Sequence, residues 1–367
     1  MMKKDLMRFR HFGLLFAFLW VFTPIFSQKD TIKSKKLLVF PVIARSIETG
    51  LSFGAAGSLT FHFNPKDSIS RTSNLQLLVL YSLKKQLVTA LNGSQYFDKE
   101  KYILNEQVSF SSFPDKFWGI GKNSPDEAEE PYKFNQFYIY LHLLYKVAPH
   151  LFVGALYEMQ KVWHLVYVPG GLFDLQNIVG KEGYLVSGLG SSLTYDNRNN
   201  AFAPGQGFFG QFSFNHFDKF FGSDFNYTNF VVDLRKYIPI QNNKVIALQL
   251  YSFSNTGKEV PIRSMASFGG VNRMRGYYEG RYKDQQQLIF QTEYRFPVYK
   301  RFGAVVFGGT GNVSKTFSDY SLSEFKYSFG GGVRFALDKK EKLNLRVDYG
   351  IGQGTNSGFY LQLGEAF

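Results

Sequence analysis

The chain has 367 residues and no cysteine, so disulfide bonds and thiolate metal sites are excluded. Its formal net charge of +13 can attract anionic partners, and for a secreted chain lipid phosphates are better candidates than nucleic acid, which we do not expect it to bind. Lysines scattered and solvated over the surface explain the charge better than either partner. Tyr (23), Phe (40) and Gly (35) are abundant, but no stretch beyond the N-terminus reaches the eighteen or so apolar residues of a membrane-spanning helix.

A secretory signal peptide is predicted at residues 1–27. Basic residues between positions 3 and 10 precede an apolar run at 13–22, which is too short to cross a membrane. Ser27 suits the position before a cleavage site. A permanent N-terminal anchor is the alternative interpretation.

Apolar and polar residues alternate with a period of two along the remaining chain, which is typical of β-strands with two different faces. Between residues 286 and 297, for example, Phe290 and Tyr294 alternate with Glu293 and Arg295. About sixteen strands are predicted from this alternation and from the turn signals between them. They lie near residues 37–45, 50–63, 73–83, 86–97, 101–113, 133–147, 150–167, 183–195, 207–217, 224–238, 244–255, 286–297, 302–314, 326–337, 342–351 and 357–367.

This pattern predicts an all-β fold, a transmembrane antiparallel β-barrel of about 16 strands. Apolar side chains would face lipid and charged side chains the lumen, and an even number of strands fits single-chain bacterial barrels. The abundant aromatic residues fit the girdles that such barrels have at the membrane interfaces. We expect the barrel at residues 37–367, after a short periplasmic segment at 28–36, as an integral protein of the Gram-negative outer membrane.

The lengths of the links predict that both termini lie in the periplasm, because such barrels have short periplasmic turns and longer outer loops. The short links then lie on the periplasmic side, at 98–100, 148–150, 241–243 and 338–341. The long links lie outside, at 114–132, 168–182, 256–285 and 315–325. Two links on the periplasmic side, 64–72 and 196–206, are longer than this rule expects.

Pro41 lies within the first predicted strand, where its ring cannot donate a ladder hydrogen bond and is tolerated mainly at a sheet edge. Its position predicts a weakly paired lateral seam between the first and last strands. Val39 and Pro41 would lie on one side of the seam, and Leu361 and Leu363 on the other. A proline at an unremarkable strand start is the alternative.

Two enzyme-like motifs are rejected because of their context. Gly50 to Gly54 matches the Gly-x-Ser-x-Gly elbow, which needs a strand-to-helix turn, whereas an alternating strand continues here. Gly205 to Gly210 matches a dinucleotide fingerprint but opens a strand instead of a helix. The acidic run at 126–130 lacks the ligand spacing of a calcium loop, and the histidines are dispersed. We therefore expect no enzymatic activity, metal site or cofactor.

Three segments of the second half carry a resemblance to a known family. The first is a turn that begins at Tyr195 and contains Asp196, Arg198, Pro204 and Gly207. The second is Phe268-Gly269-Gly270, followed by Met274-Arg275-Gly276-Tyr277, and the third is the segment 361–367 with Gly364 and Phe367. In this order they resemble the BamA/TamA superfamily of outer-membrane assembly and translocation barrels, also called bacterial surface antigens. The resemblance covers residues 183–367 well and the earlier half in outline.

The resemblance implies that the sixth outer loop folds back into the lumen, where Arg275 meets acids on the two following strands. Glu293 matches the first acid, and the alternation independently places it on the lumen face. At the second position Gly309 stands where the family usually has Asp, so we expect the loop to be held less firmly. An ordinary surface arginine in the loop is the alternative. The resemblance also implies a periplasmic turn at 195–207 and an assembly signal that ends on Phe367.

Family members that recruit unfolded clients carry periplasmic POTRA domains before the barrel. Only roughly ten residues separate the predicted cleavage site from the first strand, whereas an independent domain needs at least about 50. We therefore expect a short form without POTRA domains.

The resemblance implies a role in outer-membrane protein assembly, or in protein or lipid translocation, together with protein partners in the outer membrane or periplasm. It also implies that the host barrel-assembly machinery inserts the chain, which then contacts outer-membrane lipid and lipopolysaccharide. A structural or interaction barrel within an outer-membrane complex and a passive pore are the alternatives.

Overall fold

The computed structural model describes residues 35–46, 50–64, 66–67 and 69–367. The predicted signal peptide at 1–27 and most of the segment 28–36 lie outside these residues. Sixteen strands form one sheet in chain order, and each strand pairs antiparallel with its neighbours. No helix in the described part of the chain is long and apolar enough to cross a membrane.

The strands of the large sheet have the following bounds: β1 (Lys35–Ser46), β2 (Gly50–Phe61), β3 (Ser73–Ser82), β4 (Leu87–Phe97), β5 (Tyr102–Phe117), β6 (Glu130–Ala148), β7 (Leu151–Val166), β8 (Tyr184–Asp196), β9 (Gly207–Phe217), β10 (Tyr227–Ile240), β11 (Lys244–Thr256), β14 (Gln286–Tyr299), β15 (Phe302–Ser314), β16 (Lys326–Asp338), β17 (Leu343–Gly352) and β18 (Ser357–Leu363). The links carry a small two-stranded sheet of β12 (Ala266–Phe268) and β13 (Tyr282–Asp284), the helical turn α1 (Leu172–Leu175), and the 3-10 turns η2 (Asp126–Ala128), η3 (Lys219–Phe221), η4 (Phe317–Asp319) and η5 (Leu322–Glu324).

The structure confirms the all-β barrel and its sixteen predicted strands, but the last strand is shorter than expected. β18 ends at Leu363, whereas the sequence pattern predicted a strand from 357 to 367. Gly364 has a φ of +81°, a left-handed conformation that turns the backbone out of the sheet. The segment after Gly364 therefore leaves the barrel wall.

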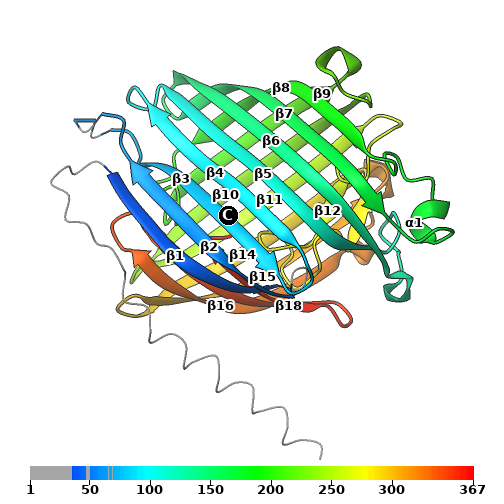
Figure 1. The fold of residues 1–367 in the computed structure, drawn as a ribbon. Helices are drawn as coiled ribbons and strands as arrows, with labels where there is room; N and C mark the ends of the chain where they lie inside the picture. The colour runs from blue at the N-terminus through cyan, green and yellow to red at the C-terminus, as the bar shows by residue number, and fades with distance from the viewer. Residues whose placement is uncertain (1–34, 47–49, 65, 68) are drawn as a thin grey trace, which may run out of the picture. The chain divides into compact units, whose positions relative to one another are not determined.

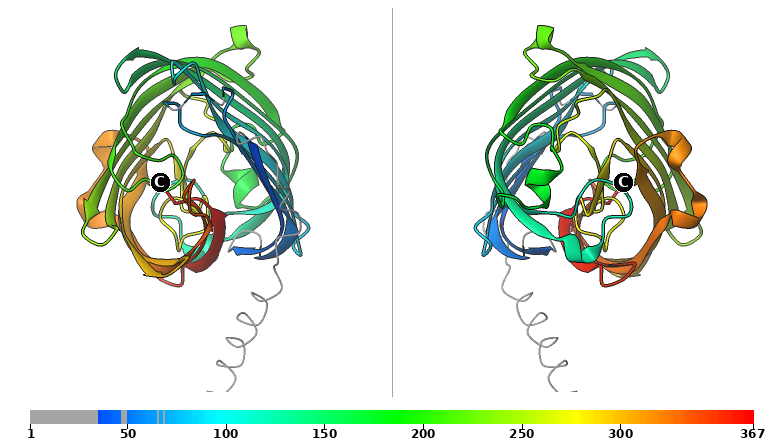
Figure 2. Two further views of the ribbon diagram at one scale, coloured as in Figure 1. Left: turned by 90° about the vertical axis from the view of Figure 1, so that its left-hand side faces the viewer. Right: turned by 90° about the vertical axis from the view of Figure 1, so that its right-hand side faces the viewer.

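The sheet curls round so that its first and last strands meet (Figures 1 and 2). β1, in blue, and β18, in red, lie side by side, yet no ladder joins them among the described residues. We call the end of the barrel at which β1 begins and β18 finishes the terminal end, and the opposite end the loop end. The longest link, residues 257–285, starts at the loop end.

The two faces of the strands differ as the alternation predicted. In β17, Arg346 and Asp348 are buried inside the barrel, whereas Val347 and Tyr349 between and after them are exposed on the outer face. In β14, Glu293 is buried and Phe290 is exposed. Polar and charged side chains thus line the interior, and the outside is apolar.

A hydrophobic cluster fills the interior near the loop end. It joins the ends of several strands to α1 and to the first arm of the long link. Its buried members are Phe117, Tyr132, Phe134, Val162, Phe173, Ile178, Tyr184, Val186, Phe217, Tyr227, Val260, Ile262 and Met265. The cluster anchors the long link inside the barrel.

The two enzyme-like motifs lie in ordinary strand structure. Gly50 to Gly54 belongs to β2, and its central Ser52 is buried within that strand. Gly205 to Gly210 leads into β9, with Gly207 at a positive φ of +114° where the strand begins.

An ion cluster ties three links together at the terminal end. Arg71, between β2 and β3, binds Glu100 at 3.0 Å and Asp196 at 2.6 Å, and its guanidinium lies 4.8 Å from the ring centre of Tyr96. Asp196 also accepts from Arg198 Nε at 2.9 Å. The predicted turn residues Asp196 and Arg198 therefore belong to this ion cluster, whose other members the sequence did not indicate.

Replacing Arg71→Ala should lower the free energy of unfolding by about 2 kcal/mol, between the values for exposed and buried ion pairs. The loss arises because Glu100 loses its cation and Asp196 loses one of two. Urea unfolding in detergent micelles measures it. Lys181→Ala, which removes the more exposed pair with Asp174, is the control and should cost clearly less stability than Arg71→Ala. Equal losses of stability in the two variants would contradict the stabilising role of this ion cluster.

Candidate functional site

The long link between β11 and β14, here called loop six (residues 257–285), returns into the barrel. Its two arms pair through β12 and β13, with Phe268 opposite Tyr282. Between them, Gly269 and Gly276 have φ values of +105° and +116°, which favour glycine and allow the tip to turn sharply. The tip reaches the middle of the barrel, where β14 and β17 place their charged residues.

Arg275 at this tip is buried between two carboxylates. Its guanidinium donates hydrogen bonds to Glu293 on β14 and, at 2.5 Å, to Asp348 on β17. The same group lies 3.6 Å from the ring centre of Phe307 on β15. The structure thus brings Arg275 and Glu293 together inside the barrel, the pair expected from the sequence.

The expectation that Gly309 weakens this contact is wrong. Asp348, two strands further along, supplies the second carboxylate, so Arg275 has two acidic partners. Gly309 has another role, because a Cβ there would lie 3.1 Å from Sδ of the fully buried Met274. The missing side chain makes room for the residue beside Arg275.

The ion pairs around Arg275 form a closed ring of alternating charge. Glu293 binds Arg295 at 2.7 Å, and Arg295 lies 3.9 Å from Glu365. Glu365 binds Arg334 at 2.7 Å, and Arg334 returns to Asp348 at 2.5 Å. We call these residues the charge ring; its members are Arg275, Glu293, Arg295, Glu365, Arg334 and Asp348. The ring connects loop six, β14, β16, β17 and the segment after β18.

The strand next to the seam also holds the tip of loop six. Gly276 N donates to Tyr360 Oη at 2.9 Å, and Tyr360 Oη donates to the Tyr277 carbonyl at 3.1 Å. Tyr277 Oη donates to the Tyr327 carbonyl at 3.0 Å. A Cβ at Gly350 would lie 2.5 Å from the Arg275 carbonyl, so the backbone of the tip packs directly on β17. Arg275, Gly276 and Tyr277 therefore all contact residues of the barrel strands inside the barrel.

The segment after β18 is folded into the barrel, which places the predicted assembly-signal residue Phe367 inside. Its side chain is 4% exposed and packs with Tyr237 and Ala247, and its main-chain oxygen accepts from Arg295 Nη2 at 2.9 Å. Glu365, two residues earlier, also accepts from Asn344 at 2.8 Å. The aromatic ring thus does not face the outside, because the turn at Gly364 redirects the chain.

The predicted seam residues lie on the two strands that meet without a ladder. Val39 and Pro41 of β1 are exposed, and Leu361 and Leu363 of β18 are half-buried. Pro41 pairs with Ala55 of β2 and has no N–H to offer. At the terminal end Lys36 of β1 binds Asp338 of β16 at 2.5 Å. A side-chain contact therefore spans the seam.

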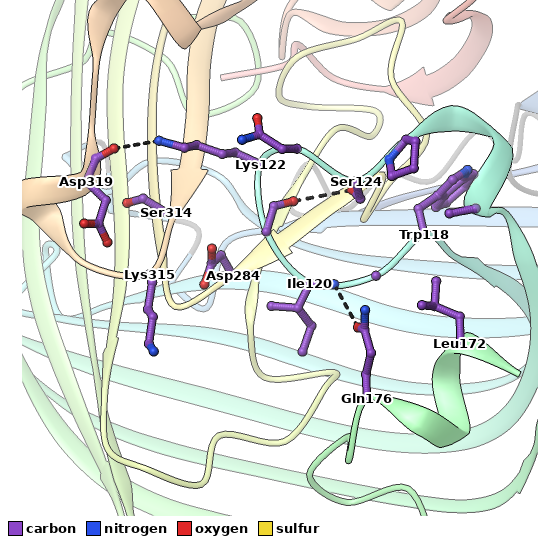
Figure 3. Close-up of a pocket in the computed structure, with 15 residues that line it drawn as sticks. Trp118, Ile120, Lys122, Ser124, Leu172, Gln176, Asp284, Ser314, Lys315 and Asp319 are labelled. Carbon is purple, nitrogen blue, oxygen red and sulfur yellow. Dashed lines mark hydrogen bonds between the residues drawn. The ribbon is translucent and has the colours of Figure 1, made fainter. Parts of the chain in front are cut away.

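Other links cover loop six at the loop end. A pocket of about 700 Å³ lies between the link 118–129, α1, the link 315–325 and Asp284 of β13 (Figure 3). Within it Lys122 donates to the Asp319 carbonyl at 2.8 Å, and Ile120 N donates to Gln176 at 3.3 Å. Gly121 N donates to the Lys283 carbonyl of loop six at 2.8 Å. These contacts hold the arms of loop six at the loop end, away from its tip.

The described residues hold no group of three or more histidines and acids that could bind a metal ion. The acidic run at 126–130 makes structural contacts instead. Asp126 pairs with Arg281 of loop six, and Glu130 accepts from the backbone of Leu172. Its charges stabilise the links around the loop.

The sequence predicted Arg275 and Glu293 but not the five residues that complete their contacts, which are Asp348, Tyr360, Arg295, Arg334 and Glu365. Asp348 and Arg346 occupy alternate positions of their predicted strand, which is the signal that places both on the lumen face. It did not indicate which lumen charges face each other across the barrel, because that depends on strand register and tilt.

Arg275→Ala should release the tip of loop six. The substitution leaves Glu293 and Asp348 short of a cation and should cost about 3 kcal/mol of stability, the lower range for a broken buried ion pair. Trypsin should then cleave after Arg281 or Lys283, both of which are buried in the intact protein. Arg273→Ala is the control, because Arg273 lies over the Tyr251 ring at 3.9 Å and is not part of the charge ring. Equal resistance to trypsin in both variants would contradict the role of Arg275 in holding the tip of loop six.

Lys283 should give loop six a pH-dependent stability. Burial lowers the pKa of its ammonium from 10.5 to about 8, and repulsion by Arg263 adds to the shift, while Asp115 and Glu279 oppose it. Because the folded protein binds the proton more weakly than the unfolded chain, stability rises as the pH increases from about 8 to 10.5.

Lys283→Met should therefore raise the Tm at neutral pH, and the gain should shrink across that interval. Thermal unfolding of both proteins measures the difference, with Lys258→Met in an exposed part of the same loop as the control. A gain that stays constant with pH would contradict the assignment.

Comparison with known proteins agrees with this architecture. The Omp85 superfamily domain matches residues 51–367. The fold is similar to BamA from Haemophilus ducreyi lacking POTRA domains 1–3, with 16% identity and a TM-score of 0.56 over 90% of this chain and 70% of that one. It is also similar to CdiB from Acinetobacter baumannii (12% identity, TM-score 0.56, 90% of this chain and 59% of that one) and to CdiB from Escherichia coli (11%, 0.58, 89% and 62%).

At these identities the solved structures show a likeness of fold, and the chain spans less than two thirds of either CdiB chain. No curated protein sequence matches it. The domain match, in contrast, covers most of the chain and includes loop six, the charge ring and the last strand. It confirms the resemblance inferred from the sequence, and the chain belongs to the Omp85 superfamily.

Proposed function

We propose that this barrel takes part in the assembly of outer-membrane proteins, or in the translocation of proteins or lipids, with the seam between β1 and β18 as a lateral gate. In this proposal loop six is an internal brace that holds the gate closed. The protein would lie in the Gram-negative outer membrane with both chain termini in the periplasm. It would act there with protein partners in the outer membrane or periplasm. It would contact phospholipid on one side and lipopolysaccharide on the other.

The unpaired seam is the observation that carries this proposal. Every other pair of neighbouring strands in the sheet is joined by a ladder, and even the shortest, between β17 and β18, has seven residue pairs. Among the described residues β1 and β18 have none. Separating them requires no ladder to be broken, so opening there costs less than at any other joint between described strands.

The contacts of β18 with loop six support a controlled gate. The hydroxyl of Tyr360 on β18 accepts from Gly276 N and donates to the Tyr277 carbonyl, both in the tip of loop six. Glu365, beyond β18, belongs to the charge ring. If β18 moves outward, these contacts must break or move with it. The position of the loop and the state of the seam are thus coupled through a small set of side chains.

A passive pore is the weaker alternative. The hydrophobic cluster near the loop end and the buried loop tip occupy the interior that an open channel needs. A structural or interaction barrel within a larger complex has the same fold but no need for an unpaired seam. The proposal assigns no catalytic step to the chain.

Locking the seam should impair the activity. Cysteines introduced by Val39→Cys and Leu361→Cys, joined by a short bis-maleimide, would hold β1 to β18. We expect this variant to fail to restore the outer-membrane protein profile of a strain that lacks the native protein, whereas the same variant without crosslinker restores it.

The matched control joins Leu59→Cys to Leu75→Cys, two outward positions that are already partners in the β2–β3 ladder. Crosslinking there should have no effect. Full activity with the seam locked would remove the gate and leave a structural role, and a large stable conductance in planar bilayers would favour the pore.

A further inference from the structure

A group of basic side chains gathers at the terminal end of the barrel, beside the seam. Three segments contribute to it: the start of β1, the turn between β14 and β15, and the turn between β16 and β17. We call this surface the basic rim; its members are Lys35, Lys36, Lys300, Arg301, Lys339, Lys340 and Lys342, all of which are exposed.

Direct contacts join the three segments into one surface. Arg301 Nη1 donates to the carbonyls of Ala336 and Leu337, at 2.9 and 3.3 Å, at the end of β16. Lys36 of β1 reaches Asp338, the next residue, at 2.5 Å. The rim is therefore continuous from β14 to β1 and passes below the end of β18.

Positive charge exceeds negative charge on this surface. Asp338 accepts from Lys36 and from the backbone N–H groups of Lys340 and Glu341, which fixes the turn. Apart from Asp338, Glu341 is the one acidic residue in the three segments, within the part of the chain that the structure describes. The three segments thus carry seven basic and two acidic residues.

The rim borders an exposed apolar and aromatic surface. Val298, Tyr299 and Phe302 flank the turn at Lys300, and each is between 45% and 63% exposed. Lys300 Nζ lies 5.0 Å from the ring centre of Tyr299. Exposed aromatic rings beside lysines are typical of the level where a membrane's headgroups meet its hydrocarbon.

We propose that the basic rim binds the phosphate groups of anionic phospholipids and holds these lipids beside the seam. The ligand has to combine an anionic head with an apolar body, because the charges stand directly above apolar side chains that face outward. An acidic protein would match the charges but not the adjoining Val298 and Phe302. The inference rests on the membrane location proposed above and does not require the barrel to transport a client.

The test uses a tryptophan reporter next to the rim. Full-length protein with Val298→Trp is reconstituted in phosphatidylcholine vesicles, and quenching by brominated phosphatidylglycerol is compared with quenching by brominated phosphatidylcholine. We expect a preference for phosphatidylglycerol that falls as salt is added, since headgroup attraction is screened. Neutralising the rim by Lys300→Gln, Arg301→Gln, Lys339→Gln, Lys340→Gln and Lys342→Gln should reduce this preference about tenfold or more.

The control variant carries Lys99→Gln, Lys101→Gln and Lys146→Gln, which remove charges at the same end of the barrel but on the wall of β4 to β7. It should keep the preference. Insertion without any preference for phosphatidylglycerol, or an equal loss in both variants, would overturn the inference and favour an acidic protein as the partner. Failure of the reporter protein to insert into vesicles would instead contradict the membrane location itself.

Discussion

The arrangement of the barrel interior depends on one buried guanidinium. Removing Arg275 from water costs several kcal/mol, and this cost is offset only by well-placed carboxylates and hydrogen bonds. Glu293 and Asp348 meet that requirement because β14 and β17 stand on opposite sides of the loop tip. The register of these strands and the inward path of loop six therefore require each other. Without these strands Arg275 would be buried with no carboxylate, and without the loop Glu293 and Asp348 would each lose one of their basic neighbours.

The charge ring extends this dependence to the end of the chain's last strand. Glu365 lies inside because Gly364 turns the backbone, and it reaches Arg334, which shares Asp348 with Arg275. Each acid in the ring has at least two basic neighbours, so losing one contact changes the charge balance around the next. In the proposed function, a movement of β18 would reach the loop tip through these adjacent side chains.

The fold could be predicted from the sequence largely because strand alternation is a local signal. The sixteen strands, the inward face of Glu293 and the path of loop six all followed from patterns within single segments or from the family resemblance. The role of Asp348 did not, since it depends on which lumen charges meet across the barrel. The inward turn at Gly364 was also missed, because a glycine in an alternating segment does not reveal its φ.

In a membrane the seam is the part of the barrel wall where unpaired backbone groups cost the most free energy. Unpaired N–H and C=O groups in hydrocarbon cost several kcal/mol each, and both edges of the seam expose them where no ladder forms. Tyr360 and Glu365 hold the β18 side to loop six and β16, and Lys36 holds β1 to Asp338 at the terminal end. An edge that is costly to leave open favours any segment that can supply a strand, and in the proposed function this would be the physical basis on which the seam accepts a client.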